Sequence, residues 1–140
     1  MEACRAADLI VHGGDFSSLA FLEALEALGP PVRAVHGNAD EPALRDRLPE
    51  QLVVDVEDVR IGLVHIPGPA AGREERLPAR FPGCDAVVFG HTHLPVVERH
   101  AGVWLLNPGS PTERRRGPFH SFLRLFVAGS ALTPELVRIT

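Results

Sequence analysis

The stretch Asp85-Ala-Val-Val-Phe-Gly-His-Thr-His93 decides how this chain is expected to fold. Its apolar run from Ala86 to Phe89 contains two β-branched valines and is typical of a short strand buried inside a sheet. A glycine ends that strand, and His91 and His93 follow it directly. Because a buried strand holds the loop at its end rigidly, functional side chains gather at such ends. The stretch therefore predicts either two metal-binding histidines or a polar turn in which the histidines are incidental.

The composition bounds the class of protein. The chain has 140 residues, enough for a sizeable core, and we expect a single domain over residues 1–140. A hydrophobic fraction of 45% is that of a globular protein, and a net charge of −4 gives no reason to expect nucleic acid as the main partner. No apolar run reaches membrane-spanning length and no signal peptide is recognisable, so we expect no membrane partner. Cys4 and Cys84 form no CxxC motif and indicate a reducing compartment, which predicts a cytoplasmic protein.

Hydrophobic patterning divides the chain into alternating strands and helices, followed by hairpins. Turn residues between apolar runs predict three hairpins, which turn at residues 57–58, 101–102 and 129–130. This order of elements indicates one α/β domain with a mixed sheet. The predicted strands cover residues 7–12, 32–36, 52–56, 59–65, 86–89, 96–100, 103–106, 122–127 and 132–139, and the predicted helices cover residues 19–28, 42–48 and 73–80.

Capping residues and prolines set the predicted ends of the helices. Ser17 or Ser18 can cap the first helix, and Asp40 can cap the second, which has Pro42 in its first turn. The third helix is a poor one because Pro78 falls inside it, and we expect the helix to break near that residue.

Side chains of metal-binding type follow the ends of four predicted strands. In open α/β sheets, ligands bind beyond the carboxyl ends of the strands. A mixture of carboxylate, amide and imidazole suits Mn²⁺, Fe or Zn²⁺ better than it suits a thiolate-bound structural zinc. Each residue alone has a plainer explanation, such as turn chemistry or a core position for a histidine. The candidate set consists of Asp15, Asn38, His65, His91 and His93.

Four short motifs lie along the chain: His12-Gly-Gly-Asp15, Gly37-Asn38-Ala-Asp40, Gly90-His-Thr-His93 and Asn107-Pro-Gly-Ser110. In order and spacing they resemble the motifs of the calcineurin-like metallophosphoesterases, and most closely those of the small bacterial and archaeal phosphodiesterases. The resemblance covers nearly the whole chain. It implies a two-layer mixed β-sandwich flanked by helices, with a dinuclear metal site on top.

Carried over by position, the resemblance implies a role for each candidate residue. Asp15 matches the carboxylate that bridges both metals. Asn38, His65 and His91 match the other ligands of one metal, and His93 matches a ligand of the second. The implied cofactors are divalent metal ions, with Mn²⁺ first and Fe, Zn²⁺ or Ni²⁺ as alternatives. Two such ions polarise the phosphoryl oxygens of a small phosphoester and turn a bridging water into hydroxide, which makes Asp15, Asn38 and His65 the implied catalytic residues.

The chain departs from the family pattern at three places. The family opens with a strand that ends in Asp-x-His and supplies two further ligands, but no Asp-x-His occurs in this sequence. We therefore expect an N-terminal truncation, either through a start assigned too far downstream or because the chain is a fragment. Ile66-Pro67 follows His65 where the family has glycine. Ala39 stands where phosphomonoesterases often carry a histidine as general acid, so diesters with good leaving groups are the expected substrates.

Two functions stay open at the level of the sequence. One is a metal-dependent phosphodiesterase. The other is a non-catalytic relative that serves protein–protein interaction, similar to the phosphoesterase-like scaffold subunit of retromer. Asn107 to Ser110 are expected to shape the rim of the site, and Arg114 to Arg116 could contact a substrate phosphate, although arginine runs more often form solvated loops. A missing strand would expose a sheet edge, through which a homo-oligomer could form.

Overall fold

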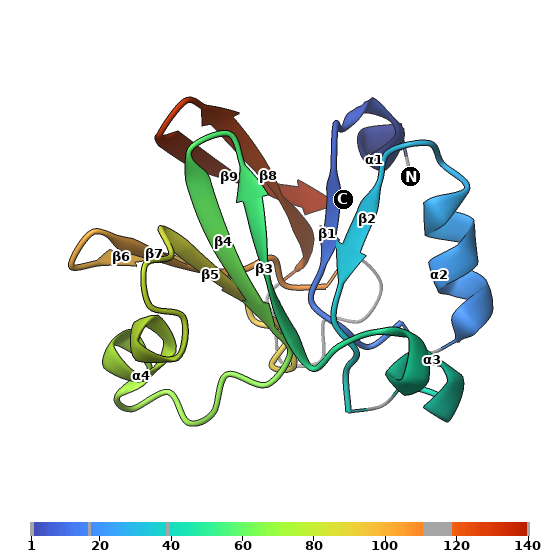
Figure 1. Ribbon diagram of the computed structural model, residues 1–140, viewed down its shortest axis with the longest axis horizontal. Helices are drawn as coiled ribbons and strands as arrows, with labels where there is room; N and C mark the ends of the chain where they lie inside the picture. Colours follow the sequence, from blue (N-terminus) through green and yellow to red (C-terminus); the bar gives the residue numbers. More distant parts are fainter. Residues whose placement is uncertain (1, 17, 39, 111–118, 140) are drawn as a thin grey trace.

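The computed structural model describes residues 2–16, 18–38, 40–110 and 119–139, and Figure 1 shows how their elements are arranged. The largest sheet is five-stranded, in the order β3-β4-β5-β7-β6, and two further sheets pair β1 with β2 and β8 with β9. The elements are α1 (Glu2–Ala6), β1 (Ile10–His12), α2 (Leu19–Glu26), β2 (Val32–Ala34), α3 (Pro42–Arg47), β3 (Gln51–Val56), β4 (Val59–Val64), α4 (Arg73–Arg80), β5 (Ala86–Phe89), β6 (Val96–His100), β7 (Val103–Asn107), β8 (His120–Ala128) and β9 (Ala131–Ile139).

Strand β5 lies at the centre of the five-stranded sheet and is buried on both faces. It runs parallel to β4 on one side and to β7 on the other. Because side chains alternate along a strand, Ala86 and Val88 belong to the core on one face, while Val87 and Phe89 belong to the core on the other. A strand covered on both faces needs apolar residues throughout. The predicted buried strand is therefore confirmed.

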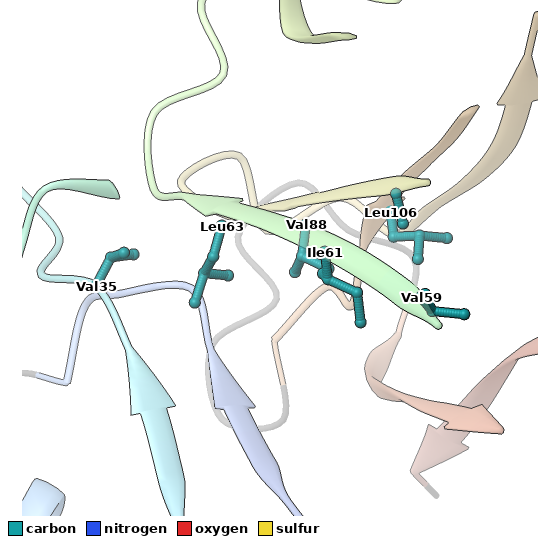
Figure 2. Close-up of a cluster of buried hydrophobic side chains, with 7 residues drawn as sticks. Val35, Val59, Ile61, Leu63, Val88 and Leu106 are labelled. Carbon is teal, nitrogen blue, oxygen red and sulfur yellow. The ribbon is translucent and has the colours of Figure 1, made fainter. Parts of the chain in front are cut away.

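One face of the five-stranded sheet packs against the two smaller sheets. Figure 2 shows the buried cluster at this interface, with Ile61 and Leu63 on β4, Val88 on β5 and Val35 just beyond β2. Side chains of the β8-β9 hairpin, among them Leu125, cover the same cluster. The β-layers thus enclose an apolar interior, as in a sandwich.

The opposite face of the sheet is covered by helix α4. Leu77 and Phe81 pack there against Val87 and Phe89 of β5. Helices α2 and α3 form a separate cluster with β2 on the other side of the molecule. A mixed sheet flanked by helices was the predicted fold class, and it is confirmed.

Helix α4 continues through Pro78, so the predicted break is wrong. The helix runs from Arg73 to Arg80 with the proline inside it. Proline removes only one backbone donor. The final turn is still closed, because the Phe81 N–H donates to the carbonyl oxygens of Leu77 and Pro78.

The two predicted helix caps differ in outcome. Ser18 caps α2, because its Oγ accepts a hydrogen bond of 3.3 Å from the Phe21 N–H. Asp40 does not cap α3. Glu41 occupies that N-cap position, and no side chain there makes a capping hydrogen bond. The carboxylate of Asp40 is engaged elsewhere, with consequences for the candidate site.

The three predicted hairpins are confirmed, with turns at residues 57–58, 101–102 and 129–130. Strands β1 and β2 are shorter than predicted, since they pair only from Ile10 with Val32 to His12 with Ala34. Among the described helices, none combines the length and the apolar character that crossing a membrane requires.

Candidate metal centre

Four loops converge beyond the carboxyl ends of β1, β2, β4 and β5, toward the bottom of the view in Figure 1. Strands β1 and β2 are parallel neighbours, and so are β4 and β5, so each pair delivers its loops to the same edge. The loops carry Asp15, Asn38, His65 and His91, respectively. The sheet topology therefore brings together residues that lie up to 76 positions apart (from 15 to 91) in the sequence.

The side chains of these four residues meet at one point. Asp15, His65 and His91 each offer one ligand atom, and these atoms all lie within 4.8 Å of one another. His65 Nε2 lies 3.1 Å from Asp15 Oδ2 and 2.9 Å from Asn38 Oδ1. His91 Nδ1 lies 3.1 Å from the same Asn38 oxygen. Four of the five residues that the sequence singled out thus form one cluster.

The tautomer of His65 places a third hydrogen-bond acceptor beside the side-chain oxygens of Asp15 and Asn38. His65 Nδ1 lies 2.6 Å from the carbonyl oxygen of Gly13, which can only accept, so Nδ1 carries the proton. Burial lowers the pKa of His65 and favours the neutral ring. Nε2 then presents a lone pair to Asp15 Oδ2 and Asn38 Oδ1, which are acceptors as well. A cation would relieve this crowding of acceptor atoms, so the donor set fits a metal ion.

The hydrogen bond from His65 Nδ1 also orients the ring. Metal-binding histidines commonly donate their second ring nitrogen to a carbonyl or carboxylate, which fixes both tautomer and direction. The rings of His65 and His91 lie nearly perpendicular, with centroids 5.2 Å apart and an interplanar angle of 81°. Their nitrogens therefore approach the Asn38 oxygen from different sides.

His93 is not a member of the group of ligand atoms that lie within 4.8 Å of one another. Its side chain is buried, with the residue 8% exposed, and its Nδ1 has no hydrogen-bond partner among the residues that the structure describes. A buried ring nitrogen without a partner costs free energy, and a ligand at that atom would remove the cost. The two histidines of the Gly90-His-Thr-His93 motif thus have different surroundings.

Asp40 is a part of the site that the sequence reading missed. Its Oδ2 accepts hydrogen bonds from the backbone N–H groups of Gly37, at 2.6 Å, and Asp15, at 3.0 Å. This buried carboxylate therefore ties the loop after β1 to the loop after β2, and it fixes Asp15 relative to Asn38. The only signal in the sequence was its place in the Gly37-Asn38-Ala-Asp40 motif, where an acidic residue before a helix also fits a cap.

Glycines allow the loops to approach so closely. A Cβ on Gly37 would collide with Asp15 Oδ1, and a Cβ on Gly14 would lie 2.8 Å from the backbone nitrogen of Gly37. Real Cβ atoms do not come that near to other heavy atoms. The two loops can thus meet only where both lack side chains.

Asn107 holds the histidine loop in place from behind. Its Nδ2 donates to the Gly90 carbonyl at 3.3 Å and to Thr92 Oγ1 at 3.1 Å, and its Oδ1 accepts from the Gly109 N–H at 2.9 Å. The side chain is fully buried. Arg114 to Arg116, for which a phosphate contact and a solvated loop were both left open, lie outside the described residues.

A cleft of about 640 Å³ opens beside Asn38 and His65. Helices α3 and α4 contribute arginines to its lining, and the loop 66–69 forms one wall. This is the loop where Ile66-Pro67 replaces the glycine of the family pattern, and Ile66 is 47% exposed.

The chain belongs to the calcineurin-like phosphoesterase superfamily, whose domain model matches residues 1–129. It is 35% identical over 142 aligned positions to a probable metallophosphoesterase of Methanothermobacter thermautotrophicus, covering 98% of this chain and 79% of that protein. It is 27% identical over 116 positions to a phosphodiesterase of Methanocaldococcus jannaschii, covering 73% of this chain and 66% of that protein. The predicted family is confirmed.

Solved structures agree with this assignment. A Thermotoga maritima protein determined by NMR superposes with a TM-score of 0.76 at 33% identity, over 98% of this chain and 84% of that one. Vps29 of Entamoeba histolytica, crystallised with zinc, superposes with a TM-score of 0.78 at 23% identity, over 98% and 86% of the two chains, and shows the shared fold alone. Calcineurin-like metallophosphoesterases use divalent metals, and the cluster of Asp15, His65 and His91 is a possible site for one.

Proposed function

We propose that this chain is a metal-dependent phosphodiesterase. The observation that carries the proposal is the meeting of Asp15 Oδ2, Asn38 Oδ1 and His65 Nε2 at one point. Neighbouring acceptor atoms repel one another, and a cation bound between them would turn this repulsion into attraction. The superfamily uses divalent ions for phosphoester hydrolysis. Relatives named as phosphodiesterases support the choice of diesters.

Under this proposal, Asp15, Asn38, His65 and His91 hold one divalent ion. Asp15 and His93 would hold a second ion. When bound, the ions supply Lewis-acid polarisation of a phosphoryl oxygen and acidify a water molecule for in-line attack. Mn²⁺ is the first choice for this oxygen- and imidazole-rich set, with Fe, Zn²⁺ or Ni²⁺ as alternatives.

The protein's own groups orient and hold the reacting atoms. The Gly13 carbonyl directs the His65 ring through Nδ1, and Asp40 holds the backbone of Asp15. A histidine able to protonate the leaving group is absent at position 39, where the sequence has alanine. The proposed substrates are therefore small diesters whose leaving alcohol departs without protonation.

Hydrolysis of bis(p-nitrophenyl) phosphate tests the proposal after removal of bound metal and addition of Mn²⁺, Fe²⁺, Zn²⁺ or Ni²⁺ in turn. We expect activity with Mn²⁺ and its loss in Asp15→Asn. Titration calorimetry should show one tight and one weak ion, because four side chains serve the first position and only Asp15 and His93 serve the second.

Two variants distinguish the two proposed ion-binding positions. Asp15→Asn should weaken the binding of both ions, whereas His93→Ala should affect only the weak one. His100→Ala serves as the control, since His100 is a partly exposed residue of β6 that contacts Glu98 at 3.0 Å. Tight metal binding without hydrolysis of any diester would favour the scaffold function instead. Self-association through a sheet edge stays a prediction, which light scattering can test.

A further inference from the structure

The cleft beside the candidate centre is continuous with the proposed metal ligands. Asn38 and His65 belong both to the four-residue cluster and to the lining of the cleft. Its volume of about 640 Å³ falls within the range of small-molecule sites. A group attached to a phosphate at the centre would therefore have room to extend into it.

Two arginines of the cleft form no ion pair with any of the described residues. Arg45 Nη2 donates to the backbone carbonyl of Asn38 at 2.6 Å, and Arg76 Nη2 donates to the carbonyls of Pro67 and Pro69. A carbonyl oxygen orients a guanidinium but does not neutralise it. Both guanidinium groups therefore bring positive charge to the wall of the cleft.

The third arginine of the cleft is partly neutralised. Arg80 donates from Nε to Gln51 Oε1 at 2.7 Å, and its Nη2 lies 3.9 Å from Glu50 Oε1. Glu50 is the one acidic residue among the described residues that line the cleft. The lining is thus positive in a chain whose net charge is −4. A concave surface of one sign concentrates ions of the other sign.

We propose that this cleft binds a second phosphate group of the substrate, carried on the alcohol arm beyond the scissile diester. The inference rests on the proposed phosphodiesterase function and narrows its substrate class. Guanidinium groups match phosphate oxygens through paired N–H donors. Val64 and Ile66 supply apolar wall to the body of the arm.

Arg45 is the residue that decides the preference for a substrate with a second phosphate. Arg76 holds the loop 66–72 through several carbonyls, so its replacement would disturb the fold of that loop. Arg45 makes a single hydrogen bond from Nη2 among the interactions of the described residues, and that bond joins the cleft to the loop of Asn38. The Arg45 guanidinium therefore lies in the cleft next to the loop that carries a proposed metal ligand.

A matched pair of chromogenic substrates tests the inference. One is the p-nitrophenyl ester of thymidine 5′-phosphate, and the other is the same ester with an added 3′-phosphate. We expect kcat/KM with Mn²⁺ to be at least about tenfold higher for the ester with the added phosphate, as one charge-assisted contact warrants. Arg45→Gln should remove most of this ratio, and Arg45→Lys should keep part of it. The ratio cancels any damage to the metal site that both substrates feel.

Arg47→Gln is the matched control. Arg47 lies on the same helix, pairs with Glu26 at 2.9 Å and does not line the cleft, so the ratio should stay that of the unaltered protein. Equal rates for both esters would overturn the inference while leaving the proposed function intact. If neither ester is hydrolysed, calorimetry with thymidine 3′,5′-bisphosphate and thymidine 5′-phosphate still tests the cleft. If the bisphosphate binds more tightly and Arg45→Gln abolishes the difference, the anion site is supported although the reaction is not. Equal binding of the two nucleotides would reject the anion site as well as the reaction.

Discussion

The two ends of the β-layers use the same uncommon backbone conformation in different ways. At the end that carries the hairpin turns, Glu57 and Ala101 both have a φ of 51°. At the end that carries the candidate centre, Asp15, His91 and His93 have φ values of 60°, 68° and 59°. Residues other than glycine rarely adopt this left-handed region. The conformation is thus shared, and only the surroundings differ.

At the hairpin end, the conformation belongs to the turn itself. Ala101 and Gly102 connect two paired strands, and both have positive φ, as a type I′ turn requires. A Cβ on Gly102 or on Gly129 would meet no atom within 4 Å. The turn at Glu57 is tied only to another turn of the same end, since the Gly129 N–H donates to Glu57 Oε1 at 3.2 Å and the Asp58 N–H donates to the Gly129 carbonyl at 3.1 Å.

At the centre, long-range contacts impose the conformation. The Asp15 N–H is held by Asp40, and Gly37 lies so near that a methyl group there would collide with the Asp15 carboxylate. Such strain persists only when the surrounding structure over-determines it. Positive φ alone therefore does not distinguish the two ends, whereas the crowded polar contacts around Asp15 do.

The largest difference between the two ends is expected in Mn²⁺ affinity when a methyl group is added at each end. Gly37→Ala should lower the affinity for Mn²⁺ by about 100-fold, because the new Cβ displaces Asp15 from its partners. Gly102→Ala should cost about 1 kcal/mol of folding stability through its positive φ and leave the affinity unchanged. Calorimetry and urea unfolding of both variants measure the two effects. Unchanged affinity in Gly37→Ala would contradict the role given to crowding.

A second test removes one acidic side chain from each end. Asp40→Ala leaves the N–H groups of Gly37 and Asp15 without their acceptor, which should cost about 2–4 kcal/mol in unfolding free energy. Loss of a mere helix cap would cost about 1 kcal/mol. Asp58→Ala, in the exposed turn between β3 and β4, should change stability by less than about 0.5 kcal/mol. Urea unfolding distinguishes these values, and a cost near 1 kcal/mol for Asp40→Ala would restore the capping role.

Features that depend on local pattern could be predicted from the sequence. The apolar run from Ala86 to Phe89 predicts a strand covered on both faces, because no polar position is left for solvent. Ligand positions follow from such strands, since parallel strands end at one edge. For this reason His65 and His91 could be placed together from the sequence, whereas Asn38 follows β2 of a separate sheet and meets them because the two sheets converge.

Features that depend on contacts across the chain could not be predicted. Asp40 stands two residues before Pro42, where a local explanation as a cap was sufficient, while its carboxylate also accepts from the Asp15 N–H, 25 residues away. The direction of His93 was equally hidden. Alternation along an extended backbone does not apply to it, because His91 and His93 both have left-handed φ values. Arg45 gave no signal, since helix surfaces commonly carry arginine.

The pH dependence of stability gives a third, smaller contrast. Burial lowers the pKa of His12 to about 4, although Asp40 opposes the shift, and the ring stacks on Phe16 at 3.8 Å. The unfolded chain binds a proton at His12 below pH 6.5, whereas the folded chain does not until about pH 4. The stability that His12 contributes is therefore fully present above pH 6.5 and is lost as the pH falls toward 4, by at most about 3 kcal/mol.

Substitution of His12 isolates this contribution. His12→Asn keeps an acceptor for the Gly14 N–H, which now bonds to His12 Nδ1 at 3.1 Å, but it removes the titrating ring. Urea unfolding between pH 4 and 7, with a chelator present, should show a shallower pH dependence in this variant. His100→Asn, at the end of β6, should leave the slope of the parent protein. An equal slope in His12→Asn would assign the effect to other groups, among them His65, whose pKa burial also lowers.

The smallest expected effect is a gain in stability at the hairpin end. Ala101 has a φ of 51° before Gly102 at 83°, and Asn-Gly is the pair best suited to such a turn. Ala101→Asn should therefore raise the unfolding free energy by about 0.5 kcal/mol, since asparagine tolerates this conformation better than alanine. Mn²⁺ affinity should not change. Asp15→Asn introduces the same amide at a φ of 60°, where the backbone tolerates it but the carboxylate charge is lost. If Ala101→Asn altered metal binding, the two ends would be energetically coupled, and the strain at the centre could not be attributed to the contacts of Asp15 with Asp40 and Gly37 alone.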